Sequence, residues 1–496
     1  MAIDNELNPV LGIDLGTTFS AIARWDGRGP NHYQMKTGES TLQSVVFCDP
    51  NGKETLVGTQ AYRKGLIDPD NMVMGIKRKM DDATQQVTAG GRSYSPIDIS
   101  AKILQRLYAD VEQKFPKGRF QGRGTVVTVP YYFKAHQCEN TRKAAQLANI
   151  ECIGIIQEPI AASLSYAWQL VTEHPDKQGV ENILVFDLGG GTFDLTLFRL
   201  ERTSTKLIFE ILASDGNDRL GGMDFDECLV KLILQKAQVS LDNLAPFEAR
   251  RAYQKVLAQA IEAKITLSST SDTYVAVPDV IPGTHIDTEV SRAEFESSIE
   301  SYVDKIKDCL SRLWISSNMQ PSKVDRVIAV GGSSIMPCMK SLLAEMIGVD
   351  KLYSNINPAL CVAEGAAMYA AYLDDHDVLG REIEIITRTC HALGVETVGG
   401  RFHKLIVENR KTPSESTEWF TNSVADMTEF ELKVYQGSSP LVAGNALIGT
   451  LKISNLPPRP KDQLDIAVTF KVNEEQKLSV IVEVEGMRKA TTLNYS

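Results

Sequence analysis

ILVFDLGGGTFDLTL occupies residues 183–197. It joins an apolar run, an aspartate, a glycine-rich turn and a second apolar run, which is the pattern of two strands in a tight hairpin. Glycine permits the positive φ of such a turn and leaves room for a ligand against the backbone. Residues 10–23, VLGIDLGTTFSAIA, show the same design about 170 residues earlier. The repeat predicts a duplicated α/β lobe, with two lobes that face each other across a cleft and each offer a hairpin.

Helical periodicity fills the intervals between and after the two hairpins. Apolar residues recur at helical spacing, as in Ile103, Leu104, Leu107 and Val111. A third strand and turn, VIAVGGSS at residues 327–334, precedes a further helix. The predicted helices are Ser100–Gln113, Lys134–Ala148, Pro159–Val171, Pro246–Leu267, Arg292–Ser316 and Pro337–Ile347.

The pattern changes after about Leu379, where helical periodicity stops and short alternating strands follow. Several short strands separated by turn signals are typical of a β-sandwich. The last ten residues, Met487–Ser496, can add one more strand. The predicted strands are His403–Glu408, Glu429–Tyr435, Ala446–Ile453, Asp465–Val472 and Lys477–Glu485.

Between the two regions lies REIEIIT, residues 381–387. Its apolar residues can be buried in one state and exposed in another, as in an interdomain linker, or the segment can be a short edge strand. We therefore predict three parts: an α/β domain at residues 1–380, a linker at 381–387 and a β-sandwich at 388–496.

Composition excludes several classes of protein. The chain has 496 residues and a net charge of −11, which argues against broad binding of nucleic acid or anionic membranes. We find no apolar run long enough to span a bilayer and no signal-peptide pattern at the N-terminus, so we expect a cytoplasmic protein. The eight cysteines form no CxxC pair and the seven histidines no HExxH motif. Buried reduced thiols are therefore favoured over disulfides or a histidine–cysteine metal site.

The two hairpins carry the strongest chemical signal. A polyphosphate needs backbone N–H donors at close range, hydroxyls and a cation. The turns at Gly16–Thr18 and Gly189–Thr192 supply the N–H groups and hydroxyls, and the sequence has no Walker-type GKS or GKT. Asp14 and Asp187 each lie beside a turn, where a carboxylate can hold Mg²⁺ through water.

Two further glycine turns fit a nucleoside. The turn at Gly331, Gly332 and Ser333 follows a predicted strand and allows a base and ribose to approach the backbone closely. Gly221 and Gly222 offer a second such turn. Either turn taken alone is more often structural.

Seven motifs, together with LGVET and NLPPRP of the β-region, resemble the seventy-kilodalton heat-shock (DnaK-like) chaperones in order and spacing, from about Val10 to about Gly486. The resemblance implies a two-lobed actin-like (ribonuclease H-like) ATPase domain followed by an all-β sandwich. It also implies an ATP-dependent, stress-response chaperone that binds ATP or ADP with Mg²⁺ and acts on unfolded or extended polypeptides. J-domain proteins and nucleotide exchange factors are the further partners it implies. The motifs are GIDLGTTFSA, VVTVPYYF, QEPIAASLSYA, VFDLGGGTFDLTL, LGGMDFD, VGGSSIMP and INPALCVAEGAA.

The resemblance also implies residue roles. Lys77 matches the catalytic lysine near the γ-phosphate and the attacking water. Glu158 and Asp194 are implied to orient that water or the metal shell. Asp187, which would support Mg²⁺, and Thr192, which would hold phosphate, complete the implied catalytic set. The residues implied to bind the nucleotide are Gly16, Thr17, Thr18, Gly189, Gly190, Gly191, Thr192, Gly221, Gly222, Lys264, Ser268, Gly331, Gly332 and Ser333.

Four positions of the α/β domain depart from the family pattern. Ile261 stands where a glutamate helps to bind the ribose, Ile335 replaces a common arginine, and Ala359 replaces an aspartate. These changes predict a lower nucleotide affinity. Gly154 stands where an arginine docks J-domain proteins, so stimulation by such proteins is an open question.

In the β-sandwich, Val398 and Ser423 align with residues that arch over a bound peptide. Phe430 falls where a smaller apolar residue lines the central pocket, and a ring there can shrink the pocket. Because the sequence ends at Ser496, we expect a sandwich without the family's helical lid. The main alternative function is an ATP-switched co-chaperone or partner-binding protein with little turnover. A small-molecule kinase on the same fold is disfavoured, because such an enzyme does not need a β-sandwich joined through an apolar linker.

Overall fold

The protein is described from a computed structural model, which covers residues 8–494 apart from 53, 83, 118–119, 121, 377–379, 390 and 474–476. The first lobe contains a sheet in the order β11-β10-β1-β2-β3, with β4 paired to β2. Within it, β1 runs antiparallel to β2 and parallel to β10. The strands are β1 (Val10–Asp14), β2 (Phe19–Trp25), β3 (Pro30–His32), β4 (Leu42–Gln43), β10 (Gly124–Val129) and β11 (Cys152–Gln157).

The second lobe contains a sheet of similar design, in the order β18-β17-β12-β13-β14-β19. Here β12 runs antiparallel to β13 and parallel to β17, which repeats the arrangement around β1. The two hairpins predicted from the sequence are therefore confirmed as β1–β2 and β12–β13. The strands are β12 (Gly179–Leu188), β13 (Phe193–Arg202), β14 (Lys206–Asn217), β17 (Arg326–Val330), β18 (Leu352–Tyr353) and β19 (Glu382–Ile386).

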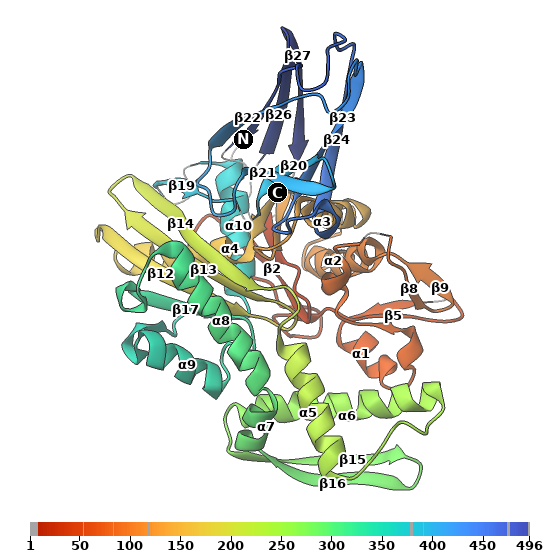
Figure 1. Ribbon diagram of the computed structural model, residues 1–496. Coiled ribbons are helices and arrows are strands. Elements are labelled where there is room, and N and C mark those ends of the chain that lie inside the picture. Colours follow the sequence, from red (N-terminus) through yellow and green to blue (C-terminus); the bar gives the residue numbers. More distant parts are fainter. Residues whose placement is uncertain are drawn as a thin grey trace.

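Helices α4 (Glu158–Glu173) and α10 (Cys361–Asp374) join the two lobes. They pack against each other, and α10 also packs on β1 and β2. Their buried residues share one apolar core with residues of both sheets, such as Val10 of β1 and Ile183 of β12. This shared core fixes the hairpins of the two lobes relative to each other (Figure 1).

Each lobe has a second core on the outer side of its sheet. Smaller elements extend both lobes: the sheet β6-β5-β7 and the hairpin β8–β9 in the first, and the hairpin β15–β16 in the second. The remaining helices are α1 (Thr59–Gly65), α2 (Pro96–Glu112), α3 (Ala135–Leu147), α5 (Gly222–Lys236), α6 (Pro246–Leu267), α7 (Arg292–Ser298), α8 (Glu300–Ser317) and α9 (Pro337–Ile347), with a 3₁₀ turn η2 (Ile76–Lys79). The smaller strands are β5 (Val46–Cys48), β6 (Thr55–Val57), β7 (Met72–Val73), β8 (Val87–Ala89), β9 (Arg92–Tyr94), β15 (Asp272–Ile281) and β16 (Thr284–Ser291).

The helix predictions agree with the structure except at two places. The predicted start of α2 at Ser100 was wrong, because Ser95 caps the helix by accepting the Asp98 N–H at 3.2 Å. The single helix predicted at Arg292–Ser316 was also wrong, because the structure breaks it at Ile299 into α7 and α8. Ile299 is fully buried with φ −105° and ψ 6°, so the chain turns there to bury this side chain while the apolar spacing continues.

Two antiparallel four-stranded sheets follow in the C-terminal part, in the orders β21-β20-β23-β24 and β22-β25-β26-β27. Their inner faces share one core that includes Val434 and Phe470, so they stack as a sandwich, seen in blue at the top of Figure 1. The sequence predictions missed β20 and β22; Tyr495 and Ser496 of the predicted last strand lie outside the described residues. The strands are β20 (Leu393–Thr397), β21 (Arg401–Ile406), β22 (Ser414–Phe420), β23 (Glu429–Gln436), β24 (Ala446–Ser454), β25 (Ile466–Val472), β26 (Lys477–Val484) and β27 (Met487–Asn494).

The segment between these parts is the edge strand β19, which runs parallel to β14. Ile383 is buried there, at 4% exposure, while Ile385 and Ile386 are half-buried. Beyond the strand, Arg388 Nε donates to the Ile211 carbonyl at 2.6 Å. His391 Nε2 lies 3.1 Å from the Tyr132 carbonyl of the first lobe. The sandwich therefore contacts both lobes.

The cysteines fit the prediction of reduced thiols. The seven within the described residues are all free, and four of them are buried: Cys48, Cys138, Cys309 and Cys361. Cys390 lies outside the described residues.

Candidate functional site

The two hairpin turns meet at their glycines. A Cβ atom placed on Gly190 would lie 1.8 Å from Thr18 Oγ1, and one on Gly191 would lie 2.5 Å from Thr17 Cγ2. A Cβ atom placed on Gly221, just before α5, would lie 2.6–2.8 Å from backbone atoms of Gly190 and Gly191. Side chains larger than hydrogen would push these turns apart, so the glycines form a cradle lined by backbone.

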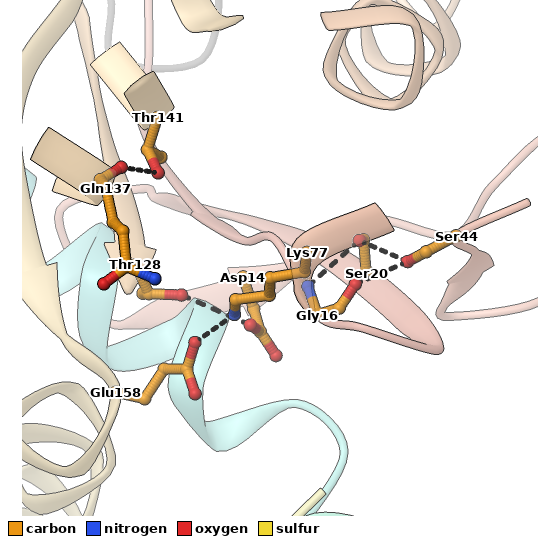
Figure 2. Close-up of polar contacts among 9 residues, drawn as sticks. All are labelled: Asp14, Gly16, Ser20, Ser44, Lys77, Thr128, Gln137, Thr141 and Glu158. Carbon is orange, nitrogen blue, oxygen red and sulfur yellow. Dashed lines mark hydrogen bonds and ion pairs between the residues drawn. The ribbon is translucent and has the colours of Figure 1, made fainter. Parts of the chain in front are cut away.

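Two serines hold the first turn. The Gly16 N–H donates to Ser20 Oγ at 3.1 Å, and Ser44 Oγ donates to the Gly16 carbonyl at 2.8 Å, as Figure 2 shows. The two hydroxyls also lie 2.9 Å apart. Sequence reasoning missed both serines. The Thr18 hydroxyl oxygen, by contrast, is buried and has no hydrogen-bond partner within the described part of the chain, which leaves it able to bind a ligand.

Lys77 and Glu158 form a buried ion pair at the base of the cradle. Lys77 lies on η2 and is 5% exposed, while Glu158 is the first residue of α4 and is 7% exposed. In Figure 2 the ammonium group points toward the Glu158 carboxylate, with Asp14 beside it. Burial alone would lower the pKa of Lys77, but the negative charges of Glu158 and Asp14 outweigh burial and raise it. Lys77 is therefore a fixed cation.

Three aspartates complete an acidic cluster with Glu158. Burial, and then the Glu158 charge, raise the pKa of Asp14 to about 7 and that of Asp194 to about 8, and raise the pKa of Asp187 well above its usual value. Thr128 Oγ1 donates to Asp14 at 3.2 Å. The four carboxyl groups outnumber the one lysine beside them, and burial further disfavours the charged forms of the three aspartates. A divalent cation fits this donor set, since Mg²⁺ prefers oxygen ligands.

The second turn borders a small polar cavity. Its lining includes Lys77, Tyr132, Thr192, Asp194 and Arg219. Its volume of about 20 Å³ is room for roughly one water molecule. Lys77, Thr192 and Asp194, which the sequence singled out, thus face one water-sized space.

Arg78 ties the first lobe to the second turn, and sequence reasoning missed it. Its Nε donates to the Gly191 carbonyl at 2.8 Å, while its two Nη atoms contact the Asp224 carboxylate of α5 at 3.2 and 2.5 Å. A planar guanidinium suits this bidentate contact. The pairing spans 146 positions, so no local pattern in the sequence could have revealed it.

The other predicted nucleotide-binding residues lie on α5, on α6 and in the turn after β17. Lys264 Nζ contacts Asp226 at 2.6 Å and donates to the Gly222 carbonyl at 3.2 Å. A Cβ on Gly222 would lie 2.5 Å from Ser333 Oγ, so these residues converge. Ser268 Oγ donates to the Lys264 carbonyl within α6. The structure thus brings Gly222, Lys264 and Ser333 together, while the Ser268 hydroxyl is engaged by its own helix.

A family model described as "Hsp70 protein" matches residues 10–495. The chain belongs to the Hsp70 family. Hsp70 proteins are ATP-dependent chaperones that bind ATP or ADP with Mg²⁺ and bind unfolded polypeptides. The glycine cradle, the buried lysine and the acidic cluster lie within the matched region.

The three predicted peptide-binding residues of this Hsp70 protein lie in different surroundings. Val398 follows β20 and is 81% exposed, and Ser423 is also exposed. Phe430 on β23 is half-buried and packs against the core of the sandwich. The phenyl ring therefore occupies space between the sheets.

Gly154 of this Hsp70 chain lies buried on β11. A Cβ there would come within 2.9 Å of Leu373 Cδ1 on α10 and 3.3 Å of Val126 Cγ2. A side chain at this position would have to displace Leu373. Separately, no helix in the described residues is both long and apolar enough to cross a membrane.

Proposed function

We propose that the protein hydrolyses ATP with Mg²⁺ and couples hydrolysis to binding of unfolded or extended polypeptide. Residues 1–380 would form the two-lobed actin-like ATPase domain, 381–387 the linker and 388–496 the polypeptide-binding sandwich. The observation that carries this proposal is the buried Lys77, paired with Glu158 and surrounded by Asp14, Asp187 and Asp194, where the two glycine turns meet.

The residues of the chain support hydrolysis through positioning and charge. The backbone of Gly189–Thr192 and the hydroxyls of Thr17 and Thr18 would bind phosphate oxygens. Lys77, a fixed cation, would stabilise the charge that develops at the γ-phosphate. Mg²⁺, held near Asp14 and Asp187, would neutralise phosphate charge when bound.

Asp194 and Glu158 would orient the attacking water. Asp194 borders the water-sized cavity, and burial raises its pKa to about 8, so its carboxylate form is a stronger base than that of a solvated aspartate. Thr192 lines the same cavity. No covalent intermediate is needed, since a positioned water can attack directly.

Coupling to the sandwich would run through β14. Near one end of this strand Asn217 pairs with Phe193, which directly follows the glycine turn. At the other end Lys206–Glu210 pair with β19, which leads into the sandwich. A movement of the turn on nucleotide binding would therefore be transmitted along β14 to the linker.

A switch with little turnover is the second candidate, and Phe430 and Ile261 favour it. Phe430 packs into the sandwich where a peptide pocket would open, and Ile261 replaces the glutamate that helps to bind the ribose. Slow hydrolysis or a narrow pocket would then make the protein a partner-docking module controlled by ATP. J-domain proteins and exchange factors stay proposed partners of either function.

Phosphate release from ATP by the full chain separates the candidates. The ATPase proposal expects steady turnover without an added acceptor, and a change in rate when a panel of unfolded peptides is added. ATP binding without turnover would support the switch, and turnover only with a small-molecule acceptor would support a kinase. Failure to bind ATP would overturn both ATP-dependent proposals.

A further inference from the structure

A closed ring of hydrogen bonds holds the turn between β1 and β2. The Gly16 N–H donates to Ser20 Oγ at 3.1 Å, and Ser44 Oγ donates to the Gly16 carbonyl at 2.8 Å. The Ser44 hydroxyl has only one proton, so Ser20 must be the donor across the 2.9 Å between the two hydroxyl oxygens. Every donor in the ring, whose three members Figure 2 draws, is therefore assigned.

Both hydroxyl groups of the ring are shielded from water. Ser20 is 1% exposed and Ser44 is 2% exposed. Hydrogen bonds that follow one another in a buried chain polarise and strengthen each other. A buried polar group that loses its partner also costs free energy, because water cannot replace the lost bond. Alanine at either position would therefore weaken the whole ring rather than a single contact.

Ser44 binds the turn through its backbone as well as through its hydroxyl. Its N–H donates to the Thr18 carbonyl at 2.8 Å, and the preceding strand β4 pairs with β2 at Ser20. The carbonyl and the N–H of one planar trans peptide unit point in opposite directions. The bond from Ser44 to the Gly16 carbonyl therefore also fixes the direction of the Thr17 N–H, a backbone donor of the glycine turn.

We propose that Ser20 and Ser44 are positioning residues, which hold the Gly16–Thr18 turn in its phosphate-binding conformation before a polyphosphate arrives. Neither serine needs to contact the ligand. A site that is arranged in advance binds more tightly, because fewer groups lose conformational freedom on binding. This inference rests on the proposed nucleotide site, whose first turn the two serines support.

Hydrogen–deuterium exchange of the nucleotide-free full chain tests the ring without any ligand. Peptides that contain Gly16 should exchange about tenfold faster in Ser20→Ala and Ser44→Ala than in the wild type, because the turn opens more often. The matched control is Ser214→Ala, which removes another buried hydroxyl, one that donates to Thr196 Oγ1 at 3.3 Å. It should leave this exchange unchanged. Wild-type exchange in both ring variants would overturn the inference, whether or not the chain binds ATP.

Calorimetric titration with the magnesium complexes of ATP and tripolyphosphate tests the effect on binding. The Kd values of both ligands should rise by about five- to tenfold in Ser20→Ala and Ser44→Ala, the effect of a lost hydrogen bond, and stay unchanged in Ser214→Ala. Tripolyphosphate has no nucleoside, so a parallel rise assigns the loss to the phosphate turn. Unchanged Kd values in both ring variants would overturn the inference alone. A wild-type chain that binds neither ligand would overturn the proposed nucleotide site, and the inference with it.

Steady-state hydrolysis separates positioning of the turn from a part in the chemical step. The turn would hold the phosphates equally in the ground state and in the transition state. KM should therefore rise in both ring variants by the same factor as Kd, while kcat stays within about twofold of the wild type. A fall in kcat at an unchanged KM would overturn the positioning role. If the wild type binds ATP without turnover, the Kd values alone decide.

The double variant Ser20→Ala/Ser44→Ala tests whether the two hydroxyls act as one ring. Either single change already breaks the ring, so the double variant should bind ATP about as weakly as each single variant. Circular dichroism checks that all variants fold. Losses of ATP affinity that add in the double variant would show two independent contacts and would overturn the ring.

Discussion

Lys77 is a buried residue for which we propose a role in the chemistry as well as in the fold. Its ammonium group is buried against Glu158 and lies within the field of Asp14 and Asp194. A buried cation is tolerated only when paired, and here the surrounding carboxylates more than supply the pairing. Its charge is thus fixed where a phosphate would develop negative charge.

Lys77→Ala should slow ATP turnover by ~10²–10³-fold, because a cation at developing charge contributes roughly 3–4 kcal/mol to the transition state. ATP binding should change far less, since the backbone and hydroxyls of the turns bind the ground state. Single-turnover kinetics and equilibrium binding measure the two effects. Lys79→Ala on the same 3₁₀ turn is the control and should leave both unchanged. A parallel loss of rate and affinity would identify Lys77 as a ground-state phosphate ligand instead.

The adjacent residues Gly331 and Gly332 differ in how much space surrounds them and in their backbone conformation. Gly331 has φ +81°, and a Cβ there would lie 2.5 Å from the Leu188 carbonyl, whereas Gly332 has nothing within 4 Å. Gly331→Ala should therefore lower the free energy of unfolding by at least ~1–2 kcal/mol. Gly332→Ala should leave stability unchanged but weaken ATP binding, if the nucleoside lies on this turn. Urea denaturation and calorimetry measure the two quantities. Normal ATP affinity in Gly332→Ala would place the nucleoside elsewhere.

Local patterns in the sequence predicted the residues of the hairpins but not their supports. Asp14, Thr17 and Thr192 lie within a few positions of their turns, so hairpin rules locate them. Ser44 reaches Gly16 across 28 positions, and Arg78 reaches Gly191 across 113. Such contacts depend on how distant segments pack together, and a short stretch of sequence does not reveal that packing.

The same contrast holds for whole elements. Periodicity predicted α6 and α9 to the residue, because Pro246 and Pro337 mark their starts. It missed the break at Ile299, where the apolar spacing continues through the turn. It also missed β22, because the first five residues of this strand, Ser414–Glu418, are all polar and resemble a loop.

The strand β19 is the element that joins the lobes to the sandwich, and it depends on Ile383. This side chain is 4% exposed within the core shared by the lobes, and the Tyr372 hydroxyl donates to the Ile383 carbonyl at 2.9 Å. Ile383→Asp would bury an unpaired charge and lose the ~1.5–3 kcal/mol that burial of isoleucine contributes.

We expect Ile383→Asp to release the linker from β14 and make it sensitive to limited proteolysis. ATP turnover should then no longer respond to peptides. The matched control is Glu384→Ala, at the half-buried neighbouring position. It removes only a surface ion pair with Lys206, so the rate of proteolysis should stay unchanged. Equal protection of the linker in both variants would contradict a role for Ile383 in docking.

At the scale of the whole molecule, the sandwich contacts both lobes. Arg388 bonds the second lobe through Ile211, and Lys411 lies 3.5 Å from Glu210. His391 lies against the Tyr132 carbonyl of the first lobe, where burial lowers its pKa below the usual 6.5. The hydrogen bond to the Tyr132 carbonyl raises this pKa, Lys134 lowers it, and Glu408 and Asp218 raise it, but burial outweighs them.

The burial of His391 predicts that docking of the sandwich on the first lobe depends on pH. A histidine with a lowered pKa in the docked state binds its proton more weakly there than when free. Docking should therefore be constant above about pH 6.5 and weaken as pH falls below it. Energy transfer between dyes on the sandwich and the first lobe measures docking. His391→Gln should flatten the profile, and His285→Gln, at an exposed site on β16, should not. An unchanged profile in His391→Gln would assign the pH dependence to another group.

The parallel pairing of β19 has a mechanical consequence. Residues 382–386 lie in register with Lys206–Glu210, and the chain leaves the far end of this ladder directly into the sandwich. Tension along the strand axis loads all of its hydrogen bonds at once in shear, whereas tension across the sheet opens them one after another. The linker therefore resists force strongly in one direction and weakly in the other. A polypeptide that pulls on the sandwich would detach it from the lobes, or leave it docked, according to the direction of its pull.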